Sequence, residues 1–273
     1  MHVVGTDYLE DVFFEHVARL PLTSLILGYG GCNVVRCARV TTRGFAHLGQ
    51  LSTLTQLTLC RPGFDLAPHI ASLAGLEELT IDTFDAQKLA SLVALKRVVF
   101  LHIAASPAAC ELTAFPLLGT FEWSTGMSLR LAEARERCAD EKDDGWDRVA
   151  FASFAGTAIS RLALDNAKYR SVADGVARLS SLAPCPHLAK LSCYVVSDEE
   201  LRAIAKIPSL EDVEITLYTN NIITGAGWRA LEDLRRLRRL EVYADSVSKR
   251  AIADGIALAN LPSASVHYIR RSV

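Results

Sequence analysis

The chain lacks the features of a membrane-spanning, secreted or nucleic-acid-binding protein. No window approaches about eighteen uncharged apolar residues, so we expect no transmembrane helix. Asp7, Glu10, Asp11 and Glu15 lie where a secretory signal peptide needs a basic start and an apolar stretch. Lys and Arg total 29 against 31 Asp and Glu. This balance offers no basic surface to nucleic acid or to an anionic membrane, and we expect neither as a partner.

The sequence also lacks the cysteine pairs that are typical of disulfide frameworks and zinc sites. Its seven cysteines are odd in number and irregular in spacing, which favours the reducing cytosol. Cys32 and Cys37 have no second pair, and Cys185, His187 and Cys193 have no fourth ligand of the kind zinc requires. We therefore expect no metal, and we expect Cys185 and Cys193 to behave as small apolar core residues.

What the sequence does contain is a repeated apolar pattern, in which three steps of three residues precede one step of two. It is clearest in residues 48–59, LGQLSTLTQLTL. The step of two indicates a strand, and the earlier steps indicate a short helix and a turn. The apolar residues that begin the expected strands are Leu25, Leu57, Leu79, Val98, Phe121, Leu162, Leu191, Val213, Leu240 and Ala264.

Neither piece of such a repeat can bury its apolar side alone. Stacked copies make the strands a parallel sheet and the helices a second layer, with the apolar residues between them. A second signature marks the helix starts, where an apolar residue precedes Ser or Thr and further apolar residues follow at fixed offsets. It occurs at Thr41, Ser197, Thr224 and Ser248. The hydroxyl of each is expected to cap the new helix.

These patterns together resemble the leucine-rich repeat family over residues 20–268, and the helix starts resemble its bacterial and cysteine-containing repeats. The resemblance implies an α/β solenoid, with a curved parallel sheet on the concave side and helices on the convex side. The family's usual Asn or Cys, three residues after the second strand leucine, is missing. Those positions hold Gly30, Pro62, Phe84, Ile103, Gly126, Ala167, Val196, Tyr218 and Asp245. We therefore expect an irregular solenoid.

We expect one domain over residues 1–273, interrupted by an insertion at 125–157 and covered at both ends. Residues 1–20 are expected to form the amino-terminal cap, with a helix at 7–20. Its inward side chains would be Leu9, Val12, Phe13, Val17 and Leu20. Residues 258–273 are expected to form the other cap, ending in an edge strand at Val266, Tyr268 and Ile269. The insertion, with charges of alternating sign at 130–137, is either a binding protrusion or a docked flap.

No motif for catalysis or for cofactor binding stands out. A Gly-x-Ser-x-Gly elbow is absent, and Gly28–Gly31 lacks the spacing of a phosphate-binding loop. Cys60 and His102 are a candidate catalytic pair, but two repeats separate them. The arginines at 235, 236, 238 and 239 are interpreted as a solvated helix end, with contact to an acidic partner or to nucleic acid as the alternative. We predict that the protein is not an enzyme and has no cofactor.

The strand residues that flank the apolar positions are the candidate binding site, because they point away from the core. They are Gln56, Thr58, Glu78, Thr80, Asp82, Arg97, Glu122, Arg161, Asp165, Lys190, Tyr194, Asp212, Glu214, Thr216, Arg239, Glu241 and Tyr243. This concave face is mixed in charge, and the family resemblance implies that it holds a protein partner. The alternatives are a substrate-receptor or effector subunit linked to an enzyme such as a ubiquitin ligase, and nucleic-acid binding. No F-box-like segment supports the ligase alternative.

Overall fold

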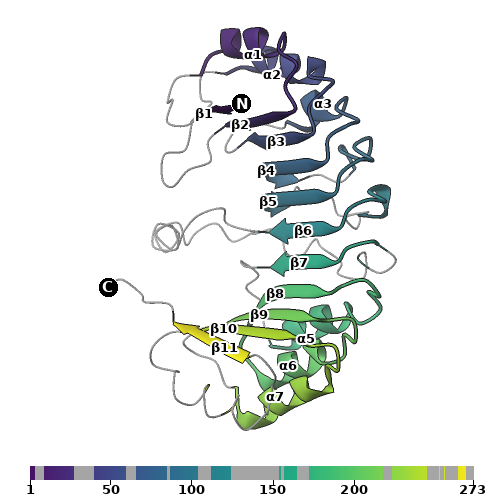
Figure 1. Ribbon diagram of the computed structural model, residues 1–273, viewed down its shortest axis with the longest axis vertical. Coiled ribbons are helices and arrows are strands. Elements are labelled where there is room, and N and C mark those ends of the chain that lie inside the picture. Colours follow the sequence, from purple (N-terminus) through teal and green to yellow (C-terminus); the bar gives the residue numbers. More distant parts are fainter. Residues whose placement is uncertain are drawn as a thin grey trace. The chain divides into compact units, whose positions relative to one another are not determined.

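The structure is a computed structural model. It describes residues 1–3, 9–27, 40–59, 66–84, 87–103, 112–123, 154, 157–164, 172–217, 223–244, 252, 255 and 264–268. The chain divides into two compact units, Met1–Val149 (unit 1) and Ala150–Val273 (unit 2). Within each unit the strands follow one another across the sheet in chain order (Figure 1). Apart from residues 154 and 157, the predicted insertion at 125–157 lies outside the described residues.

Unit 1 contains six described strands and several short helices. The strands are β1 (His2–Val3), β2 (Ser24–Leu27), β3 (Gln56–Leu59), β4 (Glu78–Phe84), β5 (Arg97–Ile103) and β6 (Thr120–Trp123). The α-helices are α1 (Asp11–Val17), α2 (Thr42–Ala46) and α3 (Ala67–Ile70), and the 3-10 helices are η1 (His47–Gln50) and η2 (Leu112–Ala114). Each described strand of this unit pairs in parallel with the next.

Unit 2 contains five described strands and longer helices. The strands are β7 (Arg161–Leu164), β8 (Lys190–Val195), β9 (Asp212–Leu217), β10 (Arg239–Ala244) and β11 (Ala264–Tyr268). The helices are α5 (Val172–Ser180), α6 (Asp198–Ile204), α7 (Gly225–Ala230) and the 3-10 helix η6 (Leu231–Asp233). Helix α6 packs between α5 and α7, and all three lie on one side of β8–β10 (Figure 1). No described helix is long and apolar enough to span a membrane.

The strand registers confirm the predicted repeats. Leu25, Leu57, Leu79, Val98 and Phe121 are successive partners in unit 1, and all are buried. Leu162, Leu191, Val213, Leu240 and Ala264 are successive partners in unit 2. The fold is therefore an α/β leucine-rich repeat solenoid with a parallel sheet. Strand β1 was not predicted, because two residues carry too little pattern to be read.

In residues 48–59 the steps of three begin in a 3-10 helix rather than in an α-helix. Leu48, Leu51, Leu54, Leu57 and Leu59 are each at most 2% exposed. Leu48 lies in the 3-10 helix η1, which has three residues per turn, so a residue returns to the same face at every third position. The predicted short helix is present here, and at Leu48 it is a 3-10 helix. Full burial of a leucine stabilises the fold by about 1.5–3 kcal/mol, so these side chains dominate each coil.

One backbone carbonyl joins each coil to the next at the start of the strand. The carbonyl of Thr23 accepts hydrogen bonds from the amides of Thr55 and Gln56, at 2.9 and 3.0 Å. In unit 2 the carbonyl of Ser160 accepts from Ala189 and Lys190 at 2.9 and 2.8 Å. Two successive backbone amides thus donate to the same carbonyl. These hydrogen bonds form whatever the side chains of the turn are.

Serine hydroxyls add hydrogen bonds between successive coils. The Ser72 hydroxyl donates to the carbonyl of Gly49 at 3.3 Å. In unit 2 the buried Ser209 hydroxyl lies 2.7 Å from the carbonyl of Leu188. These hydroxyls come before the strand, whereas the missing asparagine would follow it. Hydrogen bonds thus still connect successive coils of this solenoid.

The predicted caps are present at the three described helix starts. Thr41 accepts from the amide of Arg43 at the start of α2, and Thr224 accepts from the amide of Ala226 at the start of α7. Ser197 forms a capping box with Glu200 at the start of α6. These three predictions are confirmed, and Ser248 lies outside the described residues.

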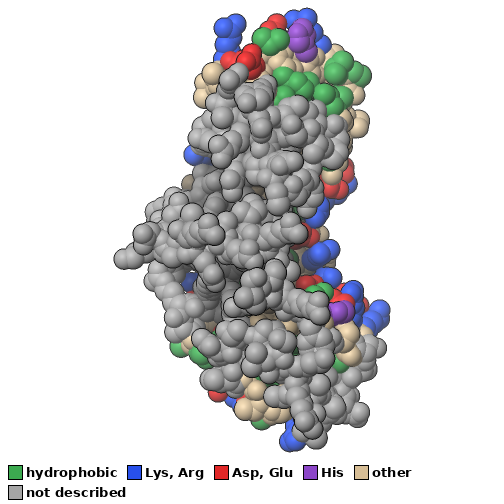
Figure 2. Space-filling view, turned by 90° about the vertical axis from the view of Figure 1, so that its left-hand side faces the viewer, with side chains coloured by type: hydrophobic (Ala, Val, Ile, Leu, Met, Phe, Trp, Pro, Cys, Tyr) green, Lys and Arg blue, Asp and Glu red, His purple; other side chains and the backbone are tan. Residues whose placement is uncertain are grey.

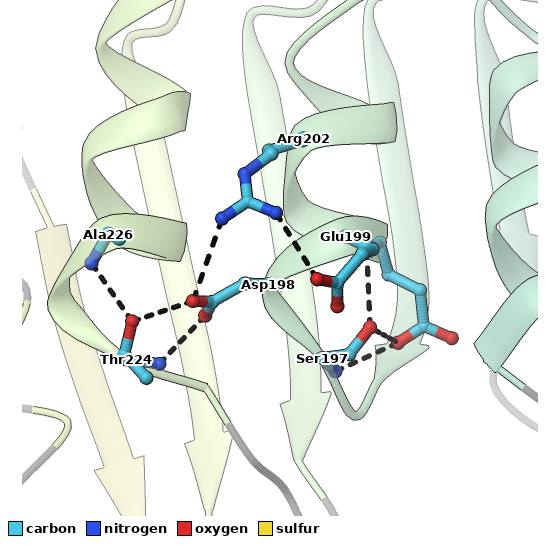
Figure 3. Close-up of polar contacts among 7 residues, drawn as sticks. Ser197, Asp198, Glu199, Arg202, Thr224 and Ala226 are labelled. Atoms are coloured by element: carbon cyan, nitrogen blue, oxygen red, sulfur yellow. Dashed lines mark hydrogen bonds and ion pairs between the residues drawn. The ribbon is translucent and has the colours of Figure 1, made fainter.

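A carboxylate from the preceding coil holds two of these capping threonines. Asp198 accepts the Thr224 amide and hydroxyl at 2.7 and 2.6 Å (Figure 3). Asp11 accepts the Thr41 amide and hydroxyl at the same distances. The hydrogen bonds from Thr41, the side-chain bond first, hold the pKa of Asp11 below its ordinary value. We call each Asp–Thr pair a carboxylate clamp; it fixes the start of one helix to the previous helix.

Each clamp requires a glycine three residues after its threonine. A Cβ added at Gly44 would overlap Asp11 Oδ1, and one added at Gly227 would overlap Asp198 Oδ1. The close approach of the carboxylate therefore explains both glycines without any unusual backbone conformation. The sequence pattern of a clamp is an aspartate in the first turn of one helix and Thr-x-x-Gly at the start of the next.

The first helix differs from its prediction. Helix α1 covers seven residues, Asp11–Val17, rather than 7–20. Leu9, Phe14 and Val17 are buried, but Val12 is 56% exposed and Leu20 is 46% exposed. The inward placement of Val12 and Leu20 was wrong, because the helix ends before Leu20 and turns Phe14 toward the core instead. The Phe14 ring packs on Phe45 of α2, with a centroid distance of 4.7 Å.

Candidate functional site

Three rows of side chains cross the outward face of the unit 2 sheet, and we call them rows A, B and C. The rows follow from the strand register, because alternate residues of a strand share a face. Row A is Arg161, Lys190, Asp212 and Arg239. Row B is Ala163, Ser192, Glu214, Glu241 and Ser265, and row C is Tyr194, Thr216, Tyr243 and His267.

Row A is a line of opposed charges. The Asp212 carboxylate lies between two cations, 3.8 Å from Lys190 Nζ and 3.9 Å from Arg239 Nη1. Acidic, basic and histidine side chains gather along the lower right edge of Figure 2. Ion pairs with this much solvent access each contribute about 0–1 kcal/mol, so row A confers charge pattern more than stability.

Glu241 of row B is the centre of a polar cluster that joins all three rows. Its Oε1 accepts a short hydrogen bond from Arg239 and lies 3.6 Å from His267 Nε2. Its Oε2 accepts from the Tyr243 hydroxyl at 3.3 Å. The Glu241 side chain is only 14% exposed, against 52% for Arg239. The hydrogen bond from Arg239 is the main reason that the pKa of Glu241 lies below its ordinary value.

Row C carries the aromatic rings of this face. Tyr243 stacks on His267 with ring centroids 5.1 Å apart and an interplanar angle of 21°. Burial raises the pKa of Tyr243 above its ordinary value, and the negative charges of Glu214 and Glu241 raise it further. Tyr194 is half-buried on β8, and Thr216 on β9 is the register partner of both tyrosines. The row therefore places a small residue between two aromatic ones.

Unit 1 has an outward face of a different kind. The Ser24 hydroxyl donates to Gln56 Oε1 at 2.7 Å, and Gln56 Nε2 donates to Glu78 Oε2 at 3.1 Å. Arg97 then lies 3.9 Å from Glu78 Oε2 and donates to Glu122 Oε2 at 3.1 Å. We call this series the polar ladder. It crosses β2–β6 and joins neighbouring strands through side-chain contacts.

The structure places most of the predicted binding residues on these two faces, but not equally accessibly. In unit 1, Thr58 and Glu122 are buried, whereas Gln56, Glu78 and Thr80 are half-buried. Asp82 lies on β4, and Asp165 lies outside the described residues. A further set lies in rows A–C of unit 2: Arg161, Lys190, Tyr194, Asp212, Glu214, Thr216, Arg239, Glu241 and Tyr243.

Sequence reasoning missed four members of rows A–C: Ala163 and Ser192, which are buried, and Ser265 and His267 on β11. The signal for Ser265 and His267 was present, because Ala264 and Val266 form the last apolar pair two residues apart. Residues that alternate with such a pair point outward, as in the earlier strands. Tyr194 and Tyr243, each the third outward residue of its strand, were predicted as binding residues. The equivalent residue of β11, His267, was not.

The arginine cluster is attached to the preceding coil rather than to a helix end. Arg236 donates to Glu211 at 2.7 Å, and Arg238 lies 3.5 Å from the same carboxylate. The interpretation as a solvated helix end was therefore incomplete, because two of the arginines also form ion pairs with Glu211, which directly precedes β9. The corresponding place in unit 1 holds Glu77 and Lys96, at 2.8 Å. Each unit thus has an acid–base contact between two successive coils at this turn.

The other candidate chemistries of the sequence gain no support. Cys185 and Cys193 are buried in the core, as predicted, and burial raises the pKa of Cys185. Cys60, which forms a candidate catalytic pair with His102, lies outside the described residues. Cys32, Cys37 and Gly28–Gly31 also lie outside them. In the part of the chain that the structure describes, no three His, Cys, Asp or Glu side chains gather as metal ligands. The face offers charges, hydrogen bonds and aromatic rings.

No protein-family model and no curated protein matches the chain. The solved structures that are similar to it at low identity include two internalins. An internalin (inlF) from Listeria monocytogenes has 13% sequence identity and a TM-score of 0.41, covering 94% of this chain and 89% of its own. An internalin C2 (inlC2) from the same species has 15% identity and a TM-score of 0.31, with 96% and 84% covered.

Proposed function

We propose that this protein is a non-enzymatic recognition module that binds a protein partner through rows A–C of unit 2. The observation that carries the proposal is the aromatic row C, in register beside two rows of charge. Tyrosine is enriched at protein interfaces, because a rigid ring buries much area while its hydroxyl keeps a polar contact. Tyr243 has this character, with its ring on His267 and its hydroxyl on Glu241.

The charge distribution supports a protein over nucleic acid as the partner. Arg236, Arg238 and Arg239 each lie within 4.0 Å of a carboxylate. A surface that neutralises phosphates needs cations in excess along a stripe, and these cations alternate with acids instead. The cytosolic location and the link to a ubiquitin ligase remain predictions of the sequence.

A capture experiment tests the proposal. The chain is tagged, incubated with extract of its native cells and crosslinked, and bound proteins are identified by mass spectrometry. The affinity of a reproducible partner is then measured for the wild type and for Tyr243→Ala. An interface anchor of this kind contributes about 2 kcal/mol, so we expect the Kd to rise about thirtyfold.

The matched control is Thr80→Ala, a change of an outward strand residue in unit 1. It should leave the Kd within about twofold, since contacts outside an interface centre contribute little. A partner that binds Tyr243→Ala as tightly as the wild type, or that is lost with Thr80→Ala, would place the interface elsewhere. The candidate then would be the unit 1 face or the insertion at 125–157.

A further inference from the structure

Strand β11 ends the strand order of unit 2 and has an open edge. In the part of the chain that the structure describes, β11 pairs with β10 and with no other strand (Figure 1). The backbone N–H and C=O groups of successive strand residues point alternately to its two sides, so an edge strand leaves about half of them without a ladder partner. At the other end of the strand order, β1 has only two residues, whereas β11 has five. The longer edge therefore offers the better template for another strand.

The apolar core is also open at this edge. The register partners Leu162, Leu191, Val213 and Leu240 are each at most 1% exposed. Ala264 continues the same column on β11, where it is half-buried instead. Its methyl group also fills less of the core than a leucine or a valine does. An apolar side chain placed beside Ala264 would remove apolar surface from water on both residues.

The sequence of β11 carries none of the features that protect an edge strand from other chains. Its residues, ASVHY, include no Asp, Glu, Lys, Arg or Pro, and no bulge interrupts its register with β10. Each of β7–β10, by contrast, begins with a charged residue of row A. Arg270 and Arg271 come after the strand has ended. Edges that must avoid other chains contain charges, proline or bulges, so β11 suits an edge that accepts a strand.

We propose that the partner protein adds an extended segment to the open edge of β11, as a further strand of the unit 2 sheet. This inference rests on the proposed function and specifies how the partner is held. Rows B and C end on β11 at Ser265 and His267, so a partner that lies on these rows reaches the edge. The segment has two apolar residues two apart, in register with Ala264 and Val266, and polar residues around them. Its backbone supplies hydrogen bonds to β11, and this alternation supplies the specificity.

Two matched peptides test the inference without the natural partner. The pattern peptide is acetyl-Thr-Thr-Leu-Thr-Val-Thr-Thr-amide. The shifted peptide, acetyl-Thr-Thr-Leu-Val-Thr-Thr-Thr-amide, has the same composition with one apolar residue on each face. Each is titrated into the full chain while the amide resonances of β11 are followed by NMR. The pattern peptide should shift these resonances in a saturable way and bind about tenfold tighter than the shifted peptide, which turns one apolar side chain to water.

Hydrogen exchange of the β11 amides completes this experiment. Alternate amides of β11 should exchange quickly in the free chain and slowly with the pattern peptide bound, because only one side of the strand faces the open edge. Equal binding of the two peptides overturns the inference. Slow exchange of every β11 amide in the free chain also overturns it, because the edge is then already covered.

N-methylation distinguishes an added strand from a contact of side chains alone. One version of the pattern peptide is methylated at the amides of its leucine and valine, and another at the amides of the threonines that follow these two residues. The two sets of amides point to opposite edges of the peptide strand. One version should therefore bind like the parent peptide and the other should not bind, whichever way the strand runs. Binding of both versions overturns the inference.

Two variants of the chain separate the edge from the outward face. Ala264→Lys places a charge on the inward side of the open edge and should lower the affinity for the pattern peptide about tenfold or more. Ser265→Lys is the same change on the outward side of the same strand, and it should leave the affinity within about threefold. Unchanged hydrogen exchange in β9 and β10 shows that each variant is folded. If Ser265→Lys abolishes binding and Ala264→Lys does not, the outward face holds the peptide and the inference is wrong.

A second copy of the chain is the competing occupant of the edge, and sedimentation velocity distinguishes it. The wild type and Ala264→Lys should sediment as the same species. A wild-type dimer that dissociates in Ala264→Lys overturns the inference, because the edge then pairs with another copy.

The two proposals fail in different ways. A captured partner that depends on Tyr243 but binds Ala264→Lys as tightly as the wild type overturns only the added strand. Binding of the pattern peptide at β11, with a partner that ignores Tyr243→Ala, overturns only the proposed interface.

Discussion

Two coils of the same length, one in each unit, contain helices of different lengths. In unit 1, 22 residues separate Leu57 from Leu79, and helix α3 between them has four residues. In unit 2, 22 residues also separate Leu191 from Val213, and helix α6 has seven. Helix α3 begins without a side-chain cap, whereas α6 begins with a capping box. Capping, rather than the length of the coil, accounts for the difference.

The two faces differ in a parallel way. The polar ladder of unit 1 joins side chains of neighbouring strands to one another, so few polar groups remain for a partner. The face of unit 2 keeps two carboxylates side by side and places tyrosines beside them. A face whose groups bond to one another adds stability, whereas a face with aromatic rings beside its charges suits a protein partner. The following predictions test this division.

The largest effect is expected at two buried aromatic side chains, one in each unit. Trp228 and Phe45 both lie four residues after a clamped threonine, and both are at most 1% exposed. Truncation of either to alanine should lower the free energy of unfolding by about 3–5 kcal/mol, since it leaves a large cavity. Urea denaturation measures the loss, and amide hydrogen exchange locates it.

Hydrogen exchange separates the two units in this experiment. Trp228→Ala should first lower protection in β9 and β10, and Phe45→Ala should first lower it in β2 and β3. A loss below about 1 kcal/mol for both would show that the core closes around the smaller side chain.

The carboxylate clamp of unit 2 should give the next largest effect. Asp198→Ala removes the acceptor of two hydrogen bonds from Thr224, which caps the start of α7. We expect a loss of about 2–3 kcal/mol in the free energy of unfolding, measured by urea denaturation. Glu199→Ala is the control on the adjacent residue. Its carboxylate is 55% exposed and pairs only with Arg202, so the loss should stay within about 0.5 kcal/mol.

Equal losses for Asp198→Ala and Glu199→Ala would mean that the clamp adds nothing beyond a surface charge. Asp11→Ala extends the comparison to unit 1, where it should also destabilise, because Thr41 loses the same two bonds.

The sequence predicted the strands better than the contacts that hold them in register. Every strand from β2 to β11 followed from pairs of apolar residues two apart, because burial on one face imposes that spacing. The clamps did not follow, since Asp11 and Thr41 are 30 residues apart and their meeting depends on the stacking of two coils. For the same reason the sequence listed Gln56 and Glu78 with Glu241 and Tyr243 as one binding face. Only the side-chain geometry separates the polar ladder from the unit 2 face.

Acid should change the stability of the fold in opposite directions at two carboxyl groups, Asp11 in unit 1 and Glu200 in unit 2. The folded state lowers the pKa of Asp11, so its contribution is present above the unfolded pKa and is lost as the pH falls through the folded value. Burial raises the pKa of Glu200, whose Oε1 has no hydrogen-bond partner. Its contribution is therefore fully present below the unfolded pKa, near 4.5, and is lost as the pH rises through the folded value.

Variants isolate these two contributions. Stability is measured from pH 7 down to pH 3, in pairs with the wild type. Glu200→Gln keeps an acceptor for the amides of Val196 and Ser197, and it should remove a rise in stability that the wild type shows on acidification from neutral pH. Asp11→Asn should remove a fall that occurs below the unfolded pKa of Asp. A difference curve of the opposite sign for either variant would contradict its assigned environment.

The smallest effect is expected in the polar ladder. Gln56 accepts from Ser24 and donates to Glu78, so Gln56→Ala breaks two hydrogen bonds between half-buried side chains. We expect a loss of about 0.5–1.5 kcal/mol in urea denaturation and an unchanged Kd for any partner of unit 2. Gln50→Ala is the control: the Gln50 side chain is exposed and lies 3.3 Å from His47 Nδ1, so the loss should stay under about 0.5 kcal/mol. If Gln56→Ala weakens the partner while leaving stability unchanged, the ladder is itself a binding surface, and the division between the two faces is wrong.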